Sequence, residues 1–195
     1  MKKQFIQDFF KANDGIIRTK QLRKAGFTHF QLNQLIQTGE VLKVKQGIYK
    51  WNDSNQSELA EVAHIVPEGI FCLYTACQYY ELSTFVASSY HLAIPKKSKV
   101  VLPDYPPIKL YYWETDSYQT GQTEIKQDGV SIRMYDLEKT VCDIIRQRNK
   151  VGLDIVKEVV VTYLQRTDRN LAKLVEYAGE LGLKNYVSNY LNILV

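Results

Sequence analysis

The apolar residues near the start of the chain recur at helical spacing and predict two short helices. The first helix ends near the turn-forming residues 13–15. The second begins at Thr19, its expected N-cap, and ends at Gly26. The apolar face of the first helix consists of Phe5, Ile6, Phe9 and Phe10.

A third helix and a hairpin follow directly. The helix begins at Thr28, its expected N-cap, and ends at Gly39. Strand-forming residues then flank a tight turn at residues 46–47, which predicts a β-hairpin. This order of helices and hairpin is that of a winged helix-turn-helix, which we assign to residues 1–53. The third helix is expected to bury Leu32, Leu35 and Ile36.

The polar, turn-rich residues 52–57 predict a short linker to a second domain, residues 54–195. Within that domain, residues 70–82 are apolar almost all round and predict a buried helix. Strand patterns follow at residues 90–95 and 108–114.

The last third of the chain begins with a hairpin pattern that turns through Asp128-Gly129. From Asp136 onward, four apolar stripes at helical spacing predict four helices. The expected fold class is therefore α+β and predominantly helical. A winged helix-turn-helix precedes a domain with a small antiparallel sheet and a helical bundle.

The composition narrows the class of protein. Hydrophobic residues make up 45% of the 195 residues, which suits a packed core and excludes a disordered chain. The sequence shows neither a signal peptide nor an apolar run near the roughly 18 residues of a membrane span. Three cysteines without framework spacing favour reduced thiols, so we expect a cytoplasmic protein.

The charge is unevenly distributed. Residues 1–51 hold ten Lys and Arg against three acidic residues, whereas residues 52–195 hold fifteen against eighteen. A basic first quarter on a slightly acidic body indicates a module that binds a polyanion. The alternative on charge alone is a solvated basic face.

The third predicted helix carries the residue types that read bases. With its apolar stripe buried, the glutamines at 31, 34 and 37 face outward, and Phe30 could touch a thymine methyl group. The alternative is a small helical domain used for protein contacts. We predict base readout by Thr28, His29, Gln31 and Gln34. We predict phosphate contacts, which fix position without reading sequence, by Lys20, Arg23, Lys24, Lys43 and Lys45.

Four segments together resemble a known family. The first three are F-I-x-x-F-F from residue 5, I-x-x-x-x-L-x-x-A-G-F from residue 17, and L-I-x-x-G-E-V-L-K-V-K-Q-G-I-Y from residue 35. The fourth is Y-D-L-E-K-T-V-C-D at residues 135–143. In these segments the chain resembles the AbiEi family of antitoxins, from bacterial abortive-infection (phage-defence) and type IV toxin–antitoxin systems.

The resemblance implies a function. The winged helix would bind inverted repeats in double-stranded DNA of its own promoter, cooperatively, and repress the operon. The C-terminal domain would counteract a nucleotidyltransferase toxin without forming a stable complex with it. The sequence has no heptad repeat, so we expect a monomer that pairs only on DNA.

No catalytic site is apparent in the sequence, so we expect no enzyme, no cofactor and no metal. A phosphate-cradling glycine motif and a Gly-Ser pair are both absent. Cys72, Cys77 and His64 are a conceivable metal cluster, but the cysteines lie in an apolar run where they are more often buried hydrophobes. A ligand-sensing regulator and an enzyme with a DNA-binding arm stay open as alternatives.

Three further groups of charged residues have two interpretations each. The first, Glu138, Lys139 and Asp143, is either a capped helix start with an i,i+4 pair or a surface that contacts a partner or the winged helix. The other two are either solvated faces or extra nucleic-acid contacts. They are Lys96-Lys97-Lys99 and Arg146-Arg148-Lys150.

Overall fold

The structure is a computed structural model that describes residues 2–52, 57–127 and 130–194. The predicted domain boundary after residue 53 and the predicted turn at Asp128-Gly129 lie outside these residues. The chain forms two compact units. Unit 1 comprises residues 1–67, 100–107 and 126–132, and unit 2 comprises residues 68–99, 108–125 and 133–195.

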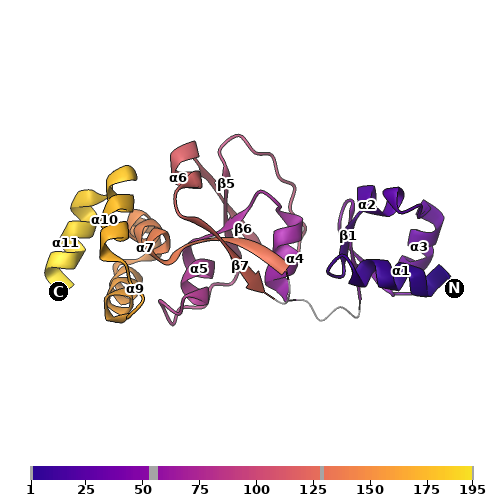
Figure 1. The fold of residues 1–195 in the computed structure, drawn as a ribbon, viewed down its shortest axis with the longest axis horizontal. Coiled ribbons are helices and arrows are strands. Elements are labelled where there is room, and N and C mark those ends of the chain that lie inside the picture. The colour runs from indigo at the N-terminus through magenta and orange to yellow at the C-terminus, as the bar shows by residue number, and fades with distance from the viewer. Residues whose placement is uncertain (1, 53–56, 128–129, 195) are drawn as a thin grey trace. The chain divides into compact units, whose positions relative to one another are not determined.

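The N-terminal part of unit 1 combines three helices with a three-stranded antiparallel sheet (Figure 1). The strands lie in the order β1-β3-β2, and all three helices contact them. Only the three-residue strand β1 was not predicted, because so short a run carries no alternation to recognise. The elements are α1 (Lys2–Lys11), β1 (Ile16–Arg18), α2 (Thr19–Lys24), α3 (His29–Gln37), β2 (Val41–Lys45) and β3 (Ile48–Trp51).

The predicted apolar stripes form the core of this part. Leu32 and Leu35 of α3 are buried, and Ile36 packs partly buried against them. The prediction of Thr28 as the N-cap of α3 is confirmed, because its hydroxyl accepts a hydrogen bond from the Gln31 amide. The prediction of Thr19 as an N-cap is wrong, because α2 already begins at Thr19 and Arg18 occupies the cap.

The rest of the chain contains a five-stranded sheet in the order β6-β5-β4-β8-β7. The strands predicted at 90–95 and 108–114 are confirmed, and the two strands of the predicted hairpin are neighbours in the sheet. Helix α4 (Glu58–Ile65) precedes them. The other elements of this region are β4 (Ile70–Phe71), α5 (Leu73–Tyr79), β5 (Tyr90–Pro95), β6 (Ile108–Trp113), α6 (Thr115–Gln119), β7 (Gln122–Gln127) and β8 (Val130–Tyr135).

The prediction of an antiparallel sheet is wrong for this region, because the sheet is mixed. Strands β5 and β6 pair in parallel, as do β4 and β8, whereas β4 and β5 are antiparallel. A parallel pair needs a crossover of roughly a dozen residues. Residues 96–107 supply it between β5 and β6 without a helix that would have marked it in the sequence.

The predicted helix at residues 70–82 divides into a strand and a shorter helix. Ile70 pairs with Ala93 and Phe71 with Leu92, so β4 lies in the middle of the sheet. The apolar pattern could not reveal this division, because a buried strand and a buried helix are both apolar all round.

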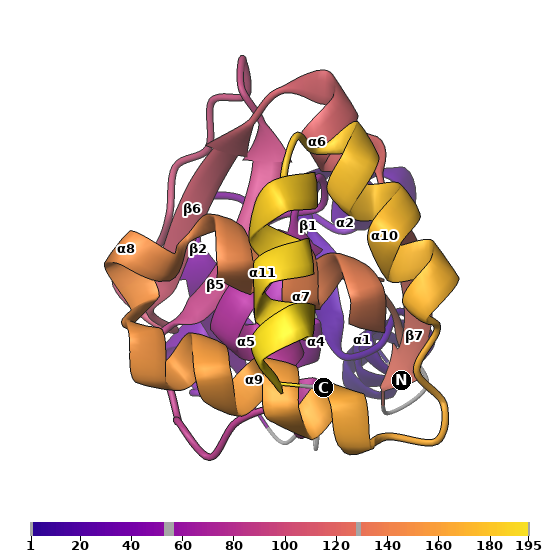
Figure 2. The ribbon, with the colours of Figure 1, turned by 90° about the vertical axis from the view of Figure 1, so that its left-hand side faces the viewer.

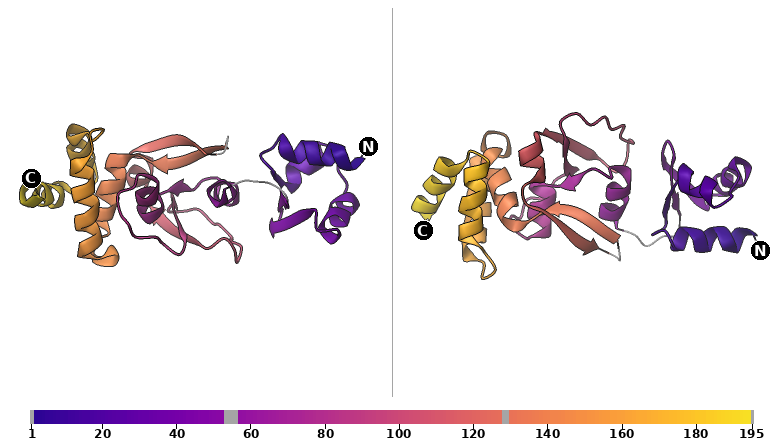
Figure 3. Two further views of the ribbon diagram at one scale, coloured as in Figure 1. Left: turned by 90° about the horizontal axis from the view of Figure 1, so that it is seen from below. Right: turned by 45° about the horizontal axis from the view of Figure 1, so that its top comes forward.

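Five helices complete unit 2, and together with the two sheets they confirm the α+β class. Helix α7 contacts α5, α9, α10 and α11, and Figure 2 shows it behind α11. Both views in Figure 3 show the C-terminal helices gathered at one end of this unit. No helix in the described part of the chain is long and apolar enough to cross a membrane. The helices are α7 (Leu137–Arg146), α8 (Arg148–Val151), α9 (Leu153–Gln165), α10 (Leu171–Glu180) and α11 (Lys184–Leu194).

Helix α7 contains a buried ion pair at the centre of the core of unit 2. The Lys139 ammonium lies 2.6 and 2.7 Å from the two carboxylate oxygens of Asp143, and both side chains are essentially inaccessible to solvent. The same ammonium lies 4.2 Å from the ring centroid of Trp113 and 4.1 Å from that of Tyr135. The predicted helix start and i,i+4 pair are therefore confirmed, and Asp136 caps the helix.

This burial excludes the alternative that the segment is a surface for a partner. Glu138, the third member of the group, is also buried, and its carboxylate accepts hydrogen bonds from the Tyr163 hydroxyl and the Asn170 amide. Gly121 packs directly on Lys139 with a φ of +72°, and a Cβ atom there would lie 2.5 Å from the Lys139 Cβ. The segment that carries part of the family resemblance is thus a structural core.

Candidate nucleic-acid interface

Helix α3 presents one face to the core and the opposite face to solvent. The exposed face carries neutral groups that can hydrogen-bond, together with one large aromatic ring. Phe30 is the most exposed of these, with 74% of its surface accessible. No Lys, Arg, Asp or Glu lies on this helix. The exposed residues are His29, Phe30, Asn33, Gln34 and Gln37.

Two of the four predicted base readers are used within the helix itself. The Gln31 side-chain oxygen accepts hydrogen bonds from the Thr28 backbone amide at 3.0 Å and from the Thr28 hydroxyl at 3.1 Å. Together with the Thr28 cap this forms a capping box, which fixes the first turn of α3. Thr28 and Gln31 therefore hold the start of the helix, whereas His29 and Gln34 are exposed on its face.

Asn33 also belongs to the exposed face of α3, although it was not among the predicted base readers. This residue is exposed one turn after His29, and its amide nitrogen lies 3.0 Å from His29 Nδ1. The three glutamines that suggested the outer face are spaced by three, so they drift around a helix of 3.6 residues per turn. The i,i+4 relation of His29 to Asn33, and of Phe30 to Gln34, marks the exposed face more accurately.

Four of the five predicted phosphate contacts are exposed cations. Lys20, Arg23 and Lys24 lie on α2, and Lys43 lies on β2. Residues 25–28 connect α2 to α3, and Gly26 adopts the left-handed conformation that ends α2 (φ +82°). Among the described residues, none of the four cations takes part in an ion pair.

The fifth predicted contact, Lys45, is used within unit 1. Its ammonium donates hydrogen bonds to the backbone oxygens of Ile65 at 2.9 Å and Val101 at 3.1 Å. Partial burial and the nearby Arg18 lower the pKa of Lys45. Lys50 is similarly committed, since it pairs with Glu61 at 2.7 Å. Lys45 and Lys50 are thus bound within unit 1, whereas Lys43, on the same hairpin, is exposed.

The conceivable metal cluster does not assemble. No group of three or more metal-ligating side chains lies together in the part of the chain that the structure describes. Cys72, Cys77 and Cys142 are buried thiols without disulfide bonds. Burial raises the pKa of each, to about 12 for Cys142. The cysteines therefore act as small core residues.

Comparison with known proteins shows a likeness of fold to a solved structure. No protein-family model and no curated protein matches the sequence. A crystal structure of the RV2827C protein from Mycobacterium tuberculosis is similar, with a TM-score of 0.60 and 9% sequence identity. The match covers 94% of this chain and 76% of that chain. At this identity the likeness shows a shared fold alone.

Proposed function

We propose that residues 2–51 form a winged helix-turn-helix that binds double-stranded DNA through α3. The observation that carries the proposal is the composition of two neighbouring surfaces. The face of α3 offers neutral hydrogen-bonding groups, while the exposed charge is on α2 and β2. Base edges are read by hydrogen bonds, whereas phosphates are held by cations, so this division matches the two tasks of a DNA-binding surface.

The connectivity supports the same assignment. Helices α2 and α3 are joined by four residues, 25–28, a length typical of the turn between the helices of this motif. In that geometry the second helix enters the major groove, while the first crosses the backbone, where Lys20, Arg23 and Lys24 would meet phosphates. The β2–β3 hairpin would serve as the wing, with Lys43 as its phosphate contact. Lys45 is left out of this revised set because its ammonium is already bound.

The face of α3 favours one class of base pair. Asn and Gln side chains bond adenine bidentately in the major groove, and apolar groups contact the thymine methyl. The exposed face of α3 therefore favours A·T pairs through Phe30, Asn33 and Gln34. The helix has no arginine or lysine that would favour guanine. We expect the preferred sites to place A·T steps under this helix.

The biological role follows from the sequence resemblance. A chain similar to AbiEi antitoxins would be a cytoplasmic repressor of its own operon that binds inverted repeats. It would also counteract a nucleotidyltransferase toxin through its C-terminal domain, without enzymatic activity and without a stable complex. Co-expression with a neighbouring nucleotidyltransferase gene tests this role. Restored growth would support it, and unchanged toxicity at full antitoxin expression would overturn it.

Fluorescence anisotropy with the DNA upstream of the gene tests DNA binding directly. We expect tight binding to this DNA and weak binding to a scrambled duplex of the same composition, with a steep dependence on salt. Equal, weak binding to both duplexes would overturn the proposal.

A pair of lysine variants on the same strand sharpens this experiment. Lys43→Ala should reduce the slope of log affinity against log salt by about 1, because one phosphate contact is lost. Lys45→Ala should leave the slope unchanged, because its ammonium is bound to Ile65 and Val101 within unit 1. Equal slopes for the two variants would show that the hairpin does not contact phosphate in this way.

A second candidate function is a winged-helix regulator whose C-terminal region senses a ligand. A hollow of about 520 Å³ between α8, α9 and α11 favours it, since ligand sites typically measure about 300–1,000 Å³. The distinguishing observation is a small molecule that changes affinity for the upstream DNA.

A further inference from the structure

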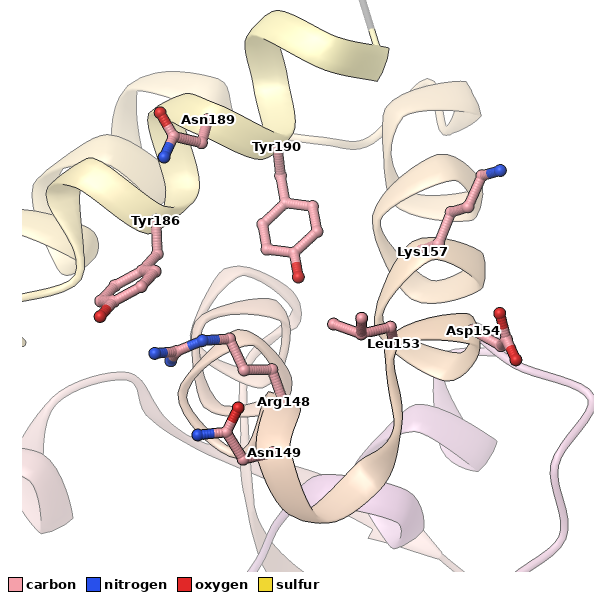
Figure 4. Close-up of a pocket in the computed structure, with 8 residues that line it drawn as sticks. All are labelled: Arg148, Asn149, Leu153, Asp154, Lys157, Tyr186, Asn189 and Tyr190. Carbon is pink, nitrogen blue, oxygen red and sulfur yellow. The ribbon is translucent and has the colours of Figure 1, made fainter.

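The hollow in the C-terminal helices lies far along the chain from the candidate DNA-binding surface. It opens between the start of α9, the short helix α8 and the side of α11 (Figure 4). Leu153 of α9 and Tyr190 of α11 point into it, and the Arg148 side chain of α8 runs along its edge toward Tyr186. Leu153 is the first residue of α9, and 67% of its surface is exposed. An exposed leucine beside two tyrosines leaves an apolar wall uncovered.

Beside this apolar wall, Arg148 and Tyr186 form a second, planar surface. The guanidinium carbon of Arg148 lies 3.7 Å from the ring centroid of Tyr186, so the two planar groups are in contact. Tyr186 is itself 42% exposed. The Tyr190 ring descends from α11 into the space between α8 and α9 (Figure 4). Planar guanidinium and aromatic groups are the surfaces on which unpaired bases stack.

The arginines of the basic cluster at residues 146–150 differ in their roles. Arg146 faces inward, where it donates hydrogen bonds to the Ser117 hydroxyl at 2.8 Å and to the Leu181 backbone oxygen at 3.2 Å. Arg148 has no carboxylate partner among the described residues, and its one hydrogen bond to protein, to the Ile145 oxygen, is long at 3.4 Å. Arg146 is therefore structural, whereas the positive charge of Arg148 is available at the hollow.

We propose that this hollow binds an unpaired nucleobase together with its phosphate. The base would stack on the Tyr190 ring and Leu153, and the Arg148 guanidinium would hold the phosphate. The amides of Asn149 and Asn189, at the rim, would bond the ribose or the base edge. A hollow of about 520 Å³ fits a single nucleotide and excludes a duplex. This site is thus distinct from the proposed DNA surface on α3.

Titration of the ¹⁵N-labelled full chain with three small probes tests the proposal. Adenosine 5′-monophosphate should shift amide signals of α8, α9 and α11 in a saturable manner. Adenosine, which lacks the phosphate, and ribose 5-phosphate, which lacks the base, should each bind at least about tenfold more weakly. Shifts that are absent up to about 10 mM, that lie outside these helices, or that are equal for ribose 5-phosphate would overturn the proposal.

Single substitutions test the phosphate contact and the base contact separately. Arg148→Gln should lower the affinity for adenosine 5′-monophosphate to that for adenosine, while leaving adenosine binding unchanged. Leu153→Trp should fill the hollow and abolish binding of both. Tyr112→Ala, which removes an exposed tyrosine outside the hollow, is the matched control and should bind normally. The same spectra report whether each variant is folded. The assignment would be contradicted if Tyr112→Ala no longer bound adenosine 5′-monophosphate more tightly than adenosine. It would also be contradicted if Arg148→Gln still did so.

The nucleotide could be free or part of a single strand. A hexamer of oligoadenylate should shift the same signals of α8, α9 and α11. If the hexamer binds much more tightly than adenosine 5′-monophosphate, the ligand is a single strand. If the two bind with equal affinity, the ligand is the free nucleotide. A hexamer that shifts only signals of residues 2–51 would overturn a strand site in this hollow.

Discussion

Helices α3 and α7 are of similar length, yet they use polar residues in opposite ways. The exposed polar residues of α3 include no Lys, Arg, Asp or Glu, and the charges lie on neighbouring elements. On α7 every residue from Leu137 to Ile145 is buried, including the ion pair of Lys139 and Asp143. A buried charge must be satisfied by the protein itself, so it fixes the core. An exposed neutral amide keeps its hydrogen-bonding capacity for a partner. We therefore expect substitutions in α7 to change stability and substitutions on the exposed face of α3 to change binding specificity.

The largest effect is expected from breaking the buried ion pair. Lys139→Met leaves Asp143 as a buried carboxylate without its partner, which should reduce the free energy of unfolding by about 3–5 kcal/mol. Urea denaturation measures this loss. The double variant Lys139→Met with Asp143→Leu should recover most of it, because no unpaired charge is left. A single variant as stable as the wild type would show that the pair is not essential to the core.

The next effect concerns the pH dependence of unit 2. Burial, with the nearby Lys109, lowers the pKa of His91 from 6.5 to about 4, and its Nδ1 lies 3.0 Å from the Tyr111 hydroxyl. The unfolded chain therefore binds a proton at His91 before the folded chain does. Stability should be fully present above pH 6.5 and decrease as the pH falls toward 4, by up to about 3 kcal/mol.

Thermal or urea unfolding between pH 4 and 7 measures this dependence. His91→Asn keeps a neutral polar group near Tyr111 and should flatten the curve over this interval. An unchanged curve in the variant would assign the pH dependence to other groups.

A smaller effect should separate two glutamines of α3. Gln34→Ala should weaken binding to the preferred DNA by about 1–3 kcal/mol and relax the preference at one base step, without affecting stability. Gln31→Ala removes one half of the capping box, so it should lower stability by about 0.5–2 kcal/mol and leave base preference intact. Anisotropy with single-base variants of the site, combined with urea denaturation, compares them. The reverse result would exchange the two roles.

The smallest effect tests the aromatic ring on α3. Replacing thymine by uracil removes only a methyl group, so a contact with Phe30 should be weakened by about 0.8 kcal/mol. Phe30→Ala should bind thymine and uracil sites equally. If the wild type also binds them equally while still preferring its site, Phe30 does not contact a thymine methyl.

The sequence predicted local features better than long-range ones. Thr28, Leu32 and Leu35 could be placed because caps and apolar stripes act within one helix. The strand β4 and the mixed sheet could not, because they depend on pairing between distant segments. Spacing predicted the pair of Lys139 and Asp143 but not its burial, which Trp113 and Tyr135 create from elsewhere in the chain.

The place of β4 has a consequence for how the protein is made. This two-residue strand lies between β5 and β8, and Phe71 pairs with Met134, about 60 residues later in the chain. During synthesis the middle of the sheet therefore has to wait for β8 to leave the ribosome. Until then β4 and β5 present an open edge that can pair wrongly with other chains. The helices of residues 2–37 depend on contacts between residues that are near in sequence, so they can form much earlier than the pairing of β4 with β8. A nascent chain would thus carry an assembled N-terminal part while the β4 edge of its second sheet is still unpaired.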